Sequence, residues 1–261
     1  MQINMGKPFK HQALAKEMAS EALKDNQAAF EQMENNWSIA RASKDITIAL
    51  AARGGVFESL AAAAILGKSS DLEKGARFVI KWGCELAQFF RPAPELLLVE
   101  LSLAIGLGDH NARRQLAQAI LKHAPSDDFY SLERAQAQTL AALVDLDYDV
   151  ATRHANRLLE ASQSGEFNKA ESLLAASWAK VFRNLALQNF QGCFEALVIS
   201  HAEFSRQVDQ DLGRLQRGRE TDVMVFDMVD WSANAVDRLL RDFGYKLDAR
   251  QKFDSAQGPD F

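Results

Sequence analysis

The residues whose spacing most resembles a chemical motif are three aspartates at alternate positions, Asp145, Asp147 and Asp149. Alternating carboxylates open an EF-hand calcium loop, which also needs glycine at its sixth position and a bidentate glutamate at its twelfth. Those positions hold Val150 and Asn156, so the sequence does not predict a calcium site. We interpret the aspartates as a helix end followed by an N-cap, with carboxylates facing the positive end of the next helix dipole.

Nucleophiles and metal ligands are no better placed. The chain has no GxSxG motif, and Cys84 and Cys193 each lie in an apolar helical pattern, which is typical of small buried core residues. No pair of histidines has a metal-ligand spacing such as HExxH; the five are His11, His110, His123, His154 and His201. We therefore predict no catalytic residue, no metal site and no cofactor.

Two short segments resemble parts of binding motifs. The segment 62–69, AAAILGKS, resembles the second half of a P-loop, but it has Ala62 where the first glycine is required and it ends a helix. A helix C-terminus explains it. Four arginines surround a glycine-bounded loop, 213–218, and could hold an anion; we interpret them as a solvated loop. They are Arg206, Arg214, Arg217 and Arg219.

The composition predicts a largely helical protein. Glycine (14) and proline (5) are scarce among 261 residues, and 48% of the residues are hydrophobic, enough for a sizeable core. A net charge of -5 does not favour nucleic acid as a partner. The N-terminus lacks a signal-peptide core and we expect no other stretch to anchor the chain in a membrane, so we expect a cytoplasmic protein.

The stretch 95–108, ELLLVELSLAIGLG, is expected to be the centre of the fold. Its one interior charge is Glu100, and it is too short to cross a bilayer, which takes about 20 apolar residues. Periodicity alone cannot separate a buried helix from a buried strand in so short a run. We predict a helix, because the neighbouring segments have helical periodicity.

Helical segments follow one another along the chain. Their apolar parts end at Leu66, Leu107, Leu146 and Leu187, at intervals of 41, 39 and 41 residues, each followed by a polar turn. Gly67 is predicted to be a C′ residue and Ser70 an N-cap. The segment 221–243 is predicted to form one further helix. This predicts an all-α fold of about 10 to 12 helices in antiparallel hairpins, either a TPR- or HEAT-like solenoid or an irregular array. We expect one domain over 1–248 and an irregular tail over 249–261.

If the hairpins stack, successive turns lie along one edge. This edge would be acidic and aromatic, and aromatic residues often anchor protein interfaces. The candidate partner-binding residues are Asp109, His110, Asp147, Tyr148, Asp149 and Asn189. The alternative is that Asp109, Asp147 and Asn189 only cap helices, for which their residue types are suited.

Three segments resemble the Immunity protein 49 family of bacterial polymorphic-toxin systems. They are 101–120, LSLAIGLGDHNARRQLAQAI, 185–206, LALQNFQGCFEALVISHAEFSR, and 227–248, DMVDWSANAVDRLLRDFGYKLD. The resemblance implies a non-enzymatic, all-helical immunity protein that binds and neutralises a cognate toxin, so that the producing cell survives. The mechanism would be occlusion or locking of the toxin through an interface of at least about 1,200 Å².

Two other hypotheses remain open. A helical-repeat adaptor could present the same kind of surface to a peptide or another cellular protein. An enzyme with an unfamiliar helical site would need a pocket with several convergent polar groups and shifted pKa values.

Overall fold

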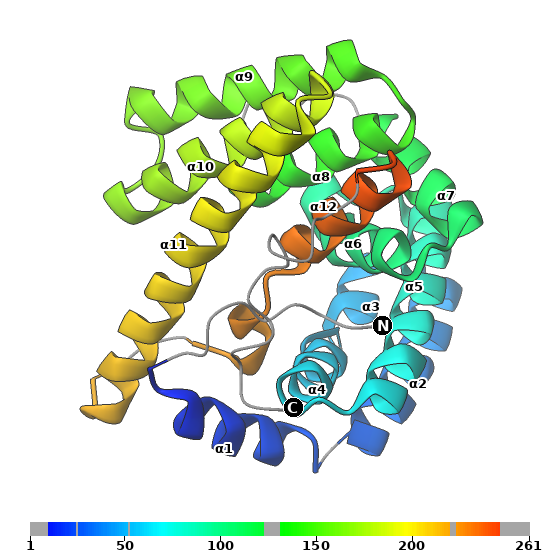
Figure 1. Ribbon diagram of the computed structural model, residues 1–261. Coiled ribbons are helices and arrows are strands. Elements are labelled where there is room, and N and C mark those ends of the chain that lie inside the picture. Colours follow the sequence, from blue (N-terminus) through cyan, green and yellow to red (C-terminus); the bar gives the residue numbers. More distant parts are fainter. Residues whose placement is uncertain (1–9, 25, 52, 123–130, 220–222, 246–261) are drawn as a thin grey trace. The chain divides into compact units, whose positions relative to one another are not determined.

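The computed structural model describes residues 10–24, 26–51, 53–122, 131–219 and 223–245 (Figure 1). These residues form α-helices labelled α1 to α12 and two 3-10 helices, η1 and η2, without a β-strand among them. The all-α prediction is therefore confirmed. The chain divides into two compact units. Their boundaries follow Val79 within α5, Phe204 within α11, and Asp230. The expected single domain over 1–248 thus comprises two units, and the tail, 249–261, lies outside the described residues.

Unit 1 is built around α4 (Arg53–Ile65), a helix with apolar residues on all sides. Every residue from Ser59 to Ile65 is buried, because α1, α2, α3 and η2 all pack against this helix. The other elements of the unit are α1 (Gln12–Ala22), α2 (Asn26–Ser43), α3 (Ile46–Ala51), η2 (Val225–Met228), the first part of α5 (Ser69–Phe90) and the last part of α11 (Phe190–Gln216).

One stretch of unit 1 does not agree with the expected absence of a possible membrane anchor. By length and composition alone, Ile46–Ile65 could cross a membrane. The core helix of a water-soluble protein meets the same criteria, and more than half of this stretch is buried inside the protein. Its apolar residues therefore already have a packing role within unit 1.

The centre of unit 2 is the apolar stretch singled out in the sequence. It forms η1 (Pro94–Leu97) and α6 (Leu98–Leu107), so the helix prediction is confirmed. All residues from Leu97 to Ile105 are buried, including Glu100, which has 0% exposure. Gly83 of α5 provides the space for this glutamate, because a Cβ atom at that glycine would lie 2.4 Å from Glu100 Cγ.

The remaining helices of unit 2 pack in chain order (Figure 1). Helix α8 packs between α7 and α9 and also contacts α6 and α10, while α9 packs along α10. The last helix of the unit, α12, lies against α6. Their bounds are α7 (His110–Leu121), α8 (Leu132–Val144), α9 (Tyr148–Ser164), α10 (Lys169–Ala186) and α12 (Trp231–Asp242). This order follows the predicted series of hairpins.

Three details of the predicted elements are wrong. The segment 221–243 is not one helix: Val229 has extended backbone (φ −115°, ψ 120°) and separates η2 from α12. Ser70 is not an N-cap, because α5 already begins at Ser69. The predicted break after Leu212 is absent, since α11 continues through Gly213 to Gln216. This glycine faces His11, whose Cε1 would lie 3.1 Å from an added Cβ, so it serves close packing.

Candidate partner-binding edge

The predicted edge residues lie in three turns of unit 2 with the same backbone geometry. The residue before each cap, Gly108, Leu146 or Gln188, has a left-handed conformation with φ of 70°, 59° and 56°. The next amide, of Asp109, Asp147 or Asn189, donates to a carbonyl five residues earlier at 2.9 Å. This is the Schellman pattern that satisfies the last carbonyl groups of a helix. The regular spacing of these turns in the sequence therefore reflects a repeated structural motif.

The helix-capping interpretation of Asp109, Asp147 and Asn189 is confirmed. Each side-chain oxygen accepts a hydrogen bond from the amide three residues later, at 3.0 Å, 3.0 Å and 3.2 Å respectively. Asn189 also donates to Asn184 Oδ1 at 2.9 Å. Contact with a partner at these positions would therefore compete with hydrogen bonds that hold the turns together.

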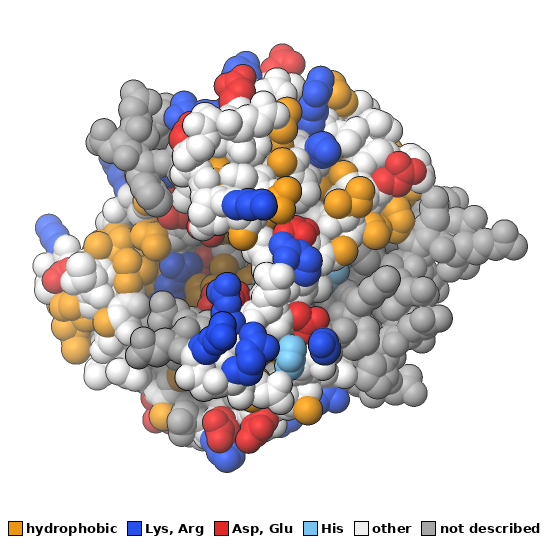
Figure 2. All heavy atoms as spheres, turned by 90° about the vertical axis from the view of Figure 1, so that its left-hand side faces the viewer, with side chains coloured by type: hydrophobic (Ala, Val, Ile, Leu, Met, Phe, Trp, Pro, Cys, Tyr) orange, Lys and Arg blue, Asp and Glu red, His pale blue; other side chains and the backbone are white. Residues whose placement is uncertain are grey.

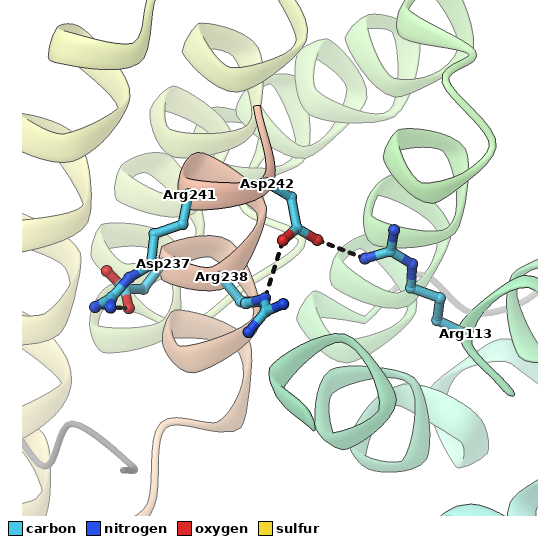
Figure 3. A network of polar contacts seen from close by, with 5 residues as sticks. All are labelled: Arg113, Asp237, Arg238, Arg241 and Asp242. Atoms are coloured by element: carbon cyan, nitrogen blue, oxygen red, sulfur yellow. Dashed lines mark hydrogen bonds and ion pairs between the residues drawn. The ribbon is translucent and has the colours of Figure 1, made fainter. Parts of the chain in front are cut away.

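The C-terminal end of α12 reaches the first of these turns through charged side chains (Figure 3). Asp242 accepts a hydrogen bond from Arg113 of α7 and another, at 3.0 Å, from Arg238 of its own helix. The Arg238 guanidinium lies against Gly108, since Nη2 would be 2.8 Å from a Cβ atom added there. Burial would raise the pKa of Asp242, but the two arginines outweigh it and lower the pKa below its usual 3.8. The carboxylate is therefore held in its charged form.

Aromatic side chains join the same helix end to the other two turns. The centroid of the Phe243 ring lies 6.4 Å from that of Tyr148, in the second turn, and 6.0 Å from that of Phe190, in the third turn. Tyr245 lies near Phe190 and Phe194, and its hydroxyl donates to Gln191 Oε1 at 2.6 Å. The structure thus brings together turns that are some 40 residues apart in the sequence. Phe243 and Tyr245 were not predicted to lie at this edge. Their only signal in the sequence is that both are aromatic, which does not show what they contact.

Several side chains of these turns remain exposed. We define the turn edge as the three turns together with Phe243 and Tyr245. Its exposed residues include His110, Asp145, Asp149, Leu146 and Leu187. The two leucines are the unusual ones, with exposures of 59% and 60%. Tyr148 and Phe190 are half-buried against Phe243, so the predicted aromatic character of the edge is only partly available to a partner.

The two cysteine thiols are far from the reactive range. Burial raises the pKa of Cys84 to about 11, with a further rise from nearby Asp109, Glu100 and Glu85. Burial raises the pKa of Cys193 to about 12. Since the thiolate is the nucleophile, both side chains are unreactive at neutral pH. Among the described residues, no group of three or more His, Cys, Asp or Glu side chains is arranged to hold a metal ion.

Two carboxylates of unit 1 have raised pKa values. Burial raises the pKa of Glu58 and of Asp227, and each carboxylate also repels a neighbouring acid. Glu58 accepts hydrogen bonds from the amides of Val225 and Phe226 at 2.9 Å and 3.3 Å, and Asp227 accepts one from Met224 at 3.1 Å. These bonds satisfy the free amides at the start of η2. The pair therefore has a structural explanation as a cap.

The arginine-rich segment at the end of α11 has exposed side chains. Figure 2 shows Lys and Arg side chains gathered on one face of the protein, with hydrophobic side chains exposed elsewhere on it. Arg214, Arg217 and Arg219 are exposed, and Arg214 pairs with Asp211 at 3.1 Å. Cations near a helix C-terminus also interact favourably with its dipole. The structure therefore agrees with solvated arginines, although most of the segment is helix and not loop.

Comparisons with known proteins identify no relative. No family model matches the chain, no curated protein matches it, and no solved structure matches it.

Proposed function

We propose that this chain is a non-enzymatic immunity protein that binds and neutralises a cognate bacterial toxin in the cytoplasm, with the turn edge as its contact surface. The observation that carries the proposal is the convergence of three capped turns on the end of α12. Phe243 alone contacts residues of two turns, and Asp242 is joined to the helix that follows the first turn. A surface fixed in this way loses little conformational entropy when a partner binds.

The charges of the edge suit a basic partner. The protein has a net charge of -5, and the second turn contains Asp145, Asp147 and Asp149 without a cation between them. Opposite charge on a toxin would steer the encounter and increase the association rate. Of the three segments that resemble the Immunity protein 49 family, one includes the first turn, one includes the third turn, and one includes Phe243 and Tyr245. The second turn lies outside them, so the resemblance is linked to part of this surface.

Growth rescue is the direct test. Cells that express the gene encoded beside this one should stop growing, and co-expression of this protein should restore growth. The two proteins should then form a complex whose affinity falls as salt is increased. A neighbouring product that is not toxic, or toxicity that co-expression leaves unchanged, would refute the proposal.

The repeated turn geometry also favours a second candidate, a helical-repeat adaptor for a cellular protein. Purification of the tagged protein from its own host distinguishes the two. Recovery of an assembly or signalling component, with no toxin encoded nearby, would support the adaptor.

A further inference from the structure

The backbone conformation and the exposure of Leu146 are both unfavourable for the stability of the fold. Its φ of 59° lies in the left-handed region, which side chains with a Cβ atom adopt at a cost and glycine adopts freely. The equivalent residue of the preceding turn is Gly108. The leucine side chain is 59% exposed, so it gains little from burial in return. Glycine at this position would fit the backbone better and would expose less apolar surface.

A second exposed leucine lies on the neighbouring turn. Leu187 is 60% exposed and is the C-cap residue of α10, three residues before Phe190. Leu146 is two residues before Tyr148, and Phe243 contacts both of these aromatic rings. The two leucines therefore lie on adjacent turns that one side chain holds together. Two anchors of this kind on a rigid support are typical of the apolar centre of a protein interface.

The charges around Leu146 indicate the chemistry of its partner. Asp145 and Asp149 are exposed on either side of it, and one oxygen of Asp147 caps α9. Two copies of this acidic surface would repel each other, which disfavours pairing of the protein with itself. A surface that covers these residues should present Lys or Arg side chains around an apolar pocket.

We infer that Leu146 and Leu187 are paired apolar anchors that insert into a cationic surface of the partner protein. This inference rests on the proposed function, and it names residues and a partner chemistry that the function alone does not specify. Asp145 and Asp149 then contribute mainly to the encounter and to the orientation of the complex, whereas the leucines determine how long it lasts.

The test compares two glycine substitutions that relieve the same backbone conformation. Leu146→Gly and Lys44→Gly should each raise the melting temperature by about 1 to 4 °C, because both residues have positive φ in a Schellman turn. The binding probe is the inactivated product of the neighbouring gene, with affinity measured by titration calorimetry. Leu146→Gly and Leu187→Ser should each raise the Kd about 10-fold or more, while Lys44→Gly, outside the turn edge, leaves it nearly unchanged.

A gain in stability together with a loss of binding is a result that a purely structural leucine would not give. The inference is overturned if Leu146→Gly lowers the melting temperature, or if it binds the probe as tightly as the wild type. The latter result would leave the proposed function intact, since the wild type still binds.

If the wild-type protein does not bind the neighbouring product, the proposed function fails and the surface is tested separately. A photo-crosslinking residue is placed at position 146 in the producing cells and compared with one at Gln163, an exposed residue of α9. Crosslinking at position 146 to a Lys- or Arg-rich segment of a protein supports the inference. Crosslinking no greater than at position 163 overturns it.

Discussion

Replacing Gly83 with alanine should destabilise unit 2, although glycine-to-alanine changes inside helices normally stabilise a protein. Gly83 is a buried residue of α5. A Cβ atom added there would lie 2.4 Å from Glu100 Cγ and 2.7 Å from Glu100 Cβ. Such distances are shorter than van der Waals contact, so one helix must shift. Glu100 cannot simply swing into water, because its side chain lies in the core with 0% exposure.

Two opposing effects determine the size of the change. Alanine gains about 1 kcal/mol over glycine in a helix interior. Overpacking a close-packed core typically costs about 1 to 3 kcal/mol, and the cost is greatest where the neighbour is close to the backbone, as Glu100 Cβ is here. We therefore expect a net loss of about 1 to 2 kcal/mol in the free energy of unfolding of unit 2.

Urea unfolding followed by circular dichroism measures this loss, and hydrogen exchange of the α6 amides assigns it to unit 2. The matched control is Gly54→Ala in α4, where an added Cβ meets no atom within 4 Å. That variant should be unchanged or more stable by up to about 1 kcal/mol. If Gly83→Ala is as stable as the wild type, α5 and α6 are not in the close contact described here.

Three further predictions concern individual polar groups. Asp147→Ala should lower the free energy of unfolding by about 1 kcal/mol because α9 loses its N-cap. The control, Asp149→Ala, should change it by less than about 0.5 kcal/mol. Equal losses for the two variants in urea unfolding would contradict the capping role. The native state binds the Glu58 proton more tightly than the unfolded chain, so the contribution of this carboxyl group to stability falls as pH rises above 4.5. Glu58→Gln should reduce this fall in stability, as measured by urea unfolding at several pH values. Asp242 has a lowered pKa, so its contribution to stability is present above about pH 4 and is lost on further acidification. Asp242→Asn should lower the free energy of unfolding by about 0.5 to 1 kcal/mol at pH 7 and remove this loss of stability in acid. An unchanged dependence of stability on pH would mean that the ion pairs contribute nothing.

Local features of the fold were predictable from the sequence because they depend on residues close together in the chain. The apolar run from Leu96 to Leu107 has no polar face to expose to water, and helical periodicity on both sides predicted a helix. It forms the end of η1 and α6. Caps are equally local, since a side chain and an amide three residues later suffice. Asp109, Asp147 and Asn189 were recognised as possible caps for this reason.

Long-range packing was not predictable. Nothing in the sequence near Phe243 shows that it contacts Tyr148, which precedes it by 95 residues. Gly213 was taken for a helix break because glycine has low helix propensity, yet tertiary packing against His11 outweighs that preference. The boundaries between the two compact units were not predictable either, since two of them fall inside continuous helices.

The structure also changes how the candidate edge should be interpreted. Capping and partner contact were treated as competing roles for Asp109, Asp147 and Asn189, and all three side chains are caps. Capping does not argue against a binding surface, because the caps and α12 fix the positions of the residues beside them. It does argue that the binding energy comes from those neighbours. Leu146 and Leu187 are exposed apolar residues beside these caps, and substitutions there should separate binding from stability.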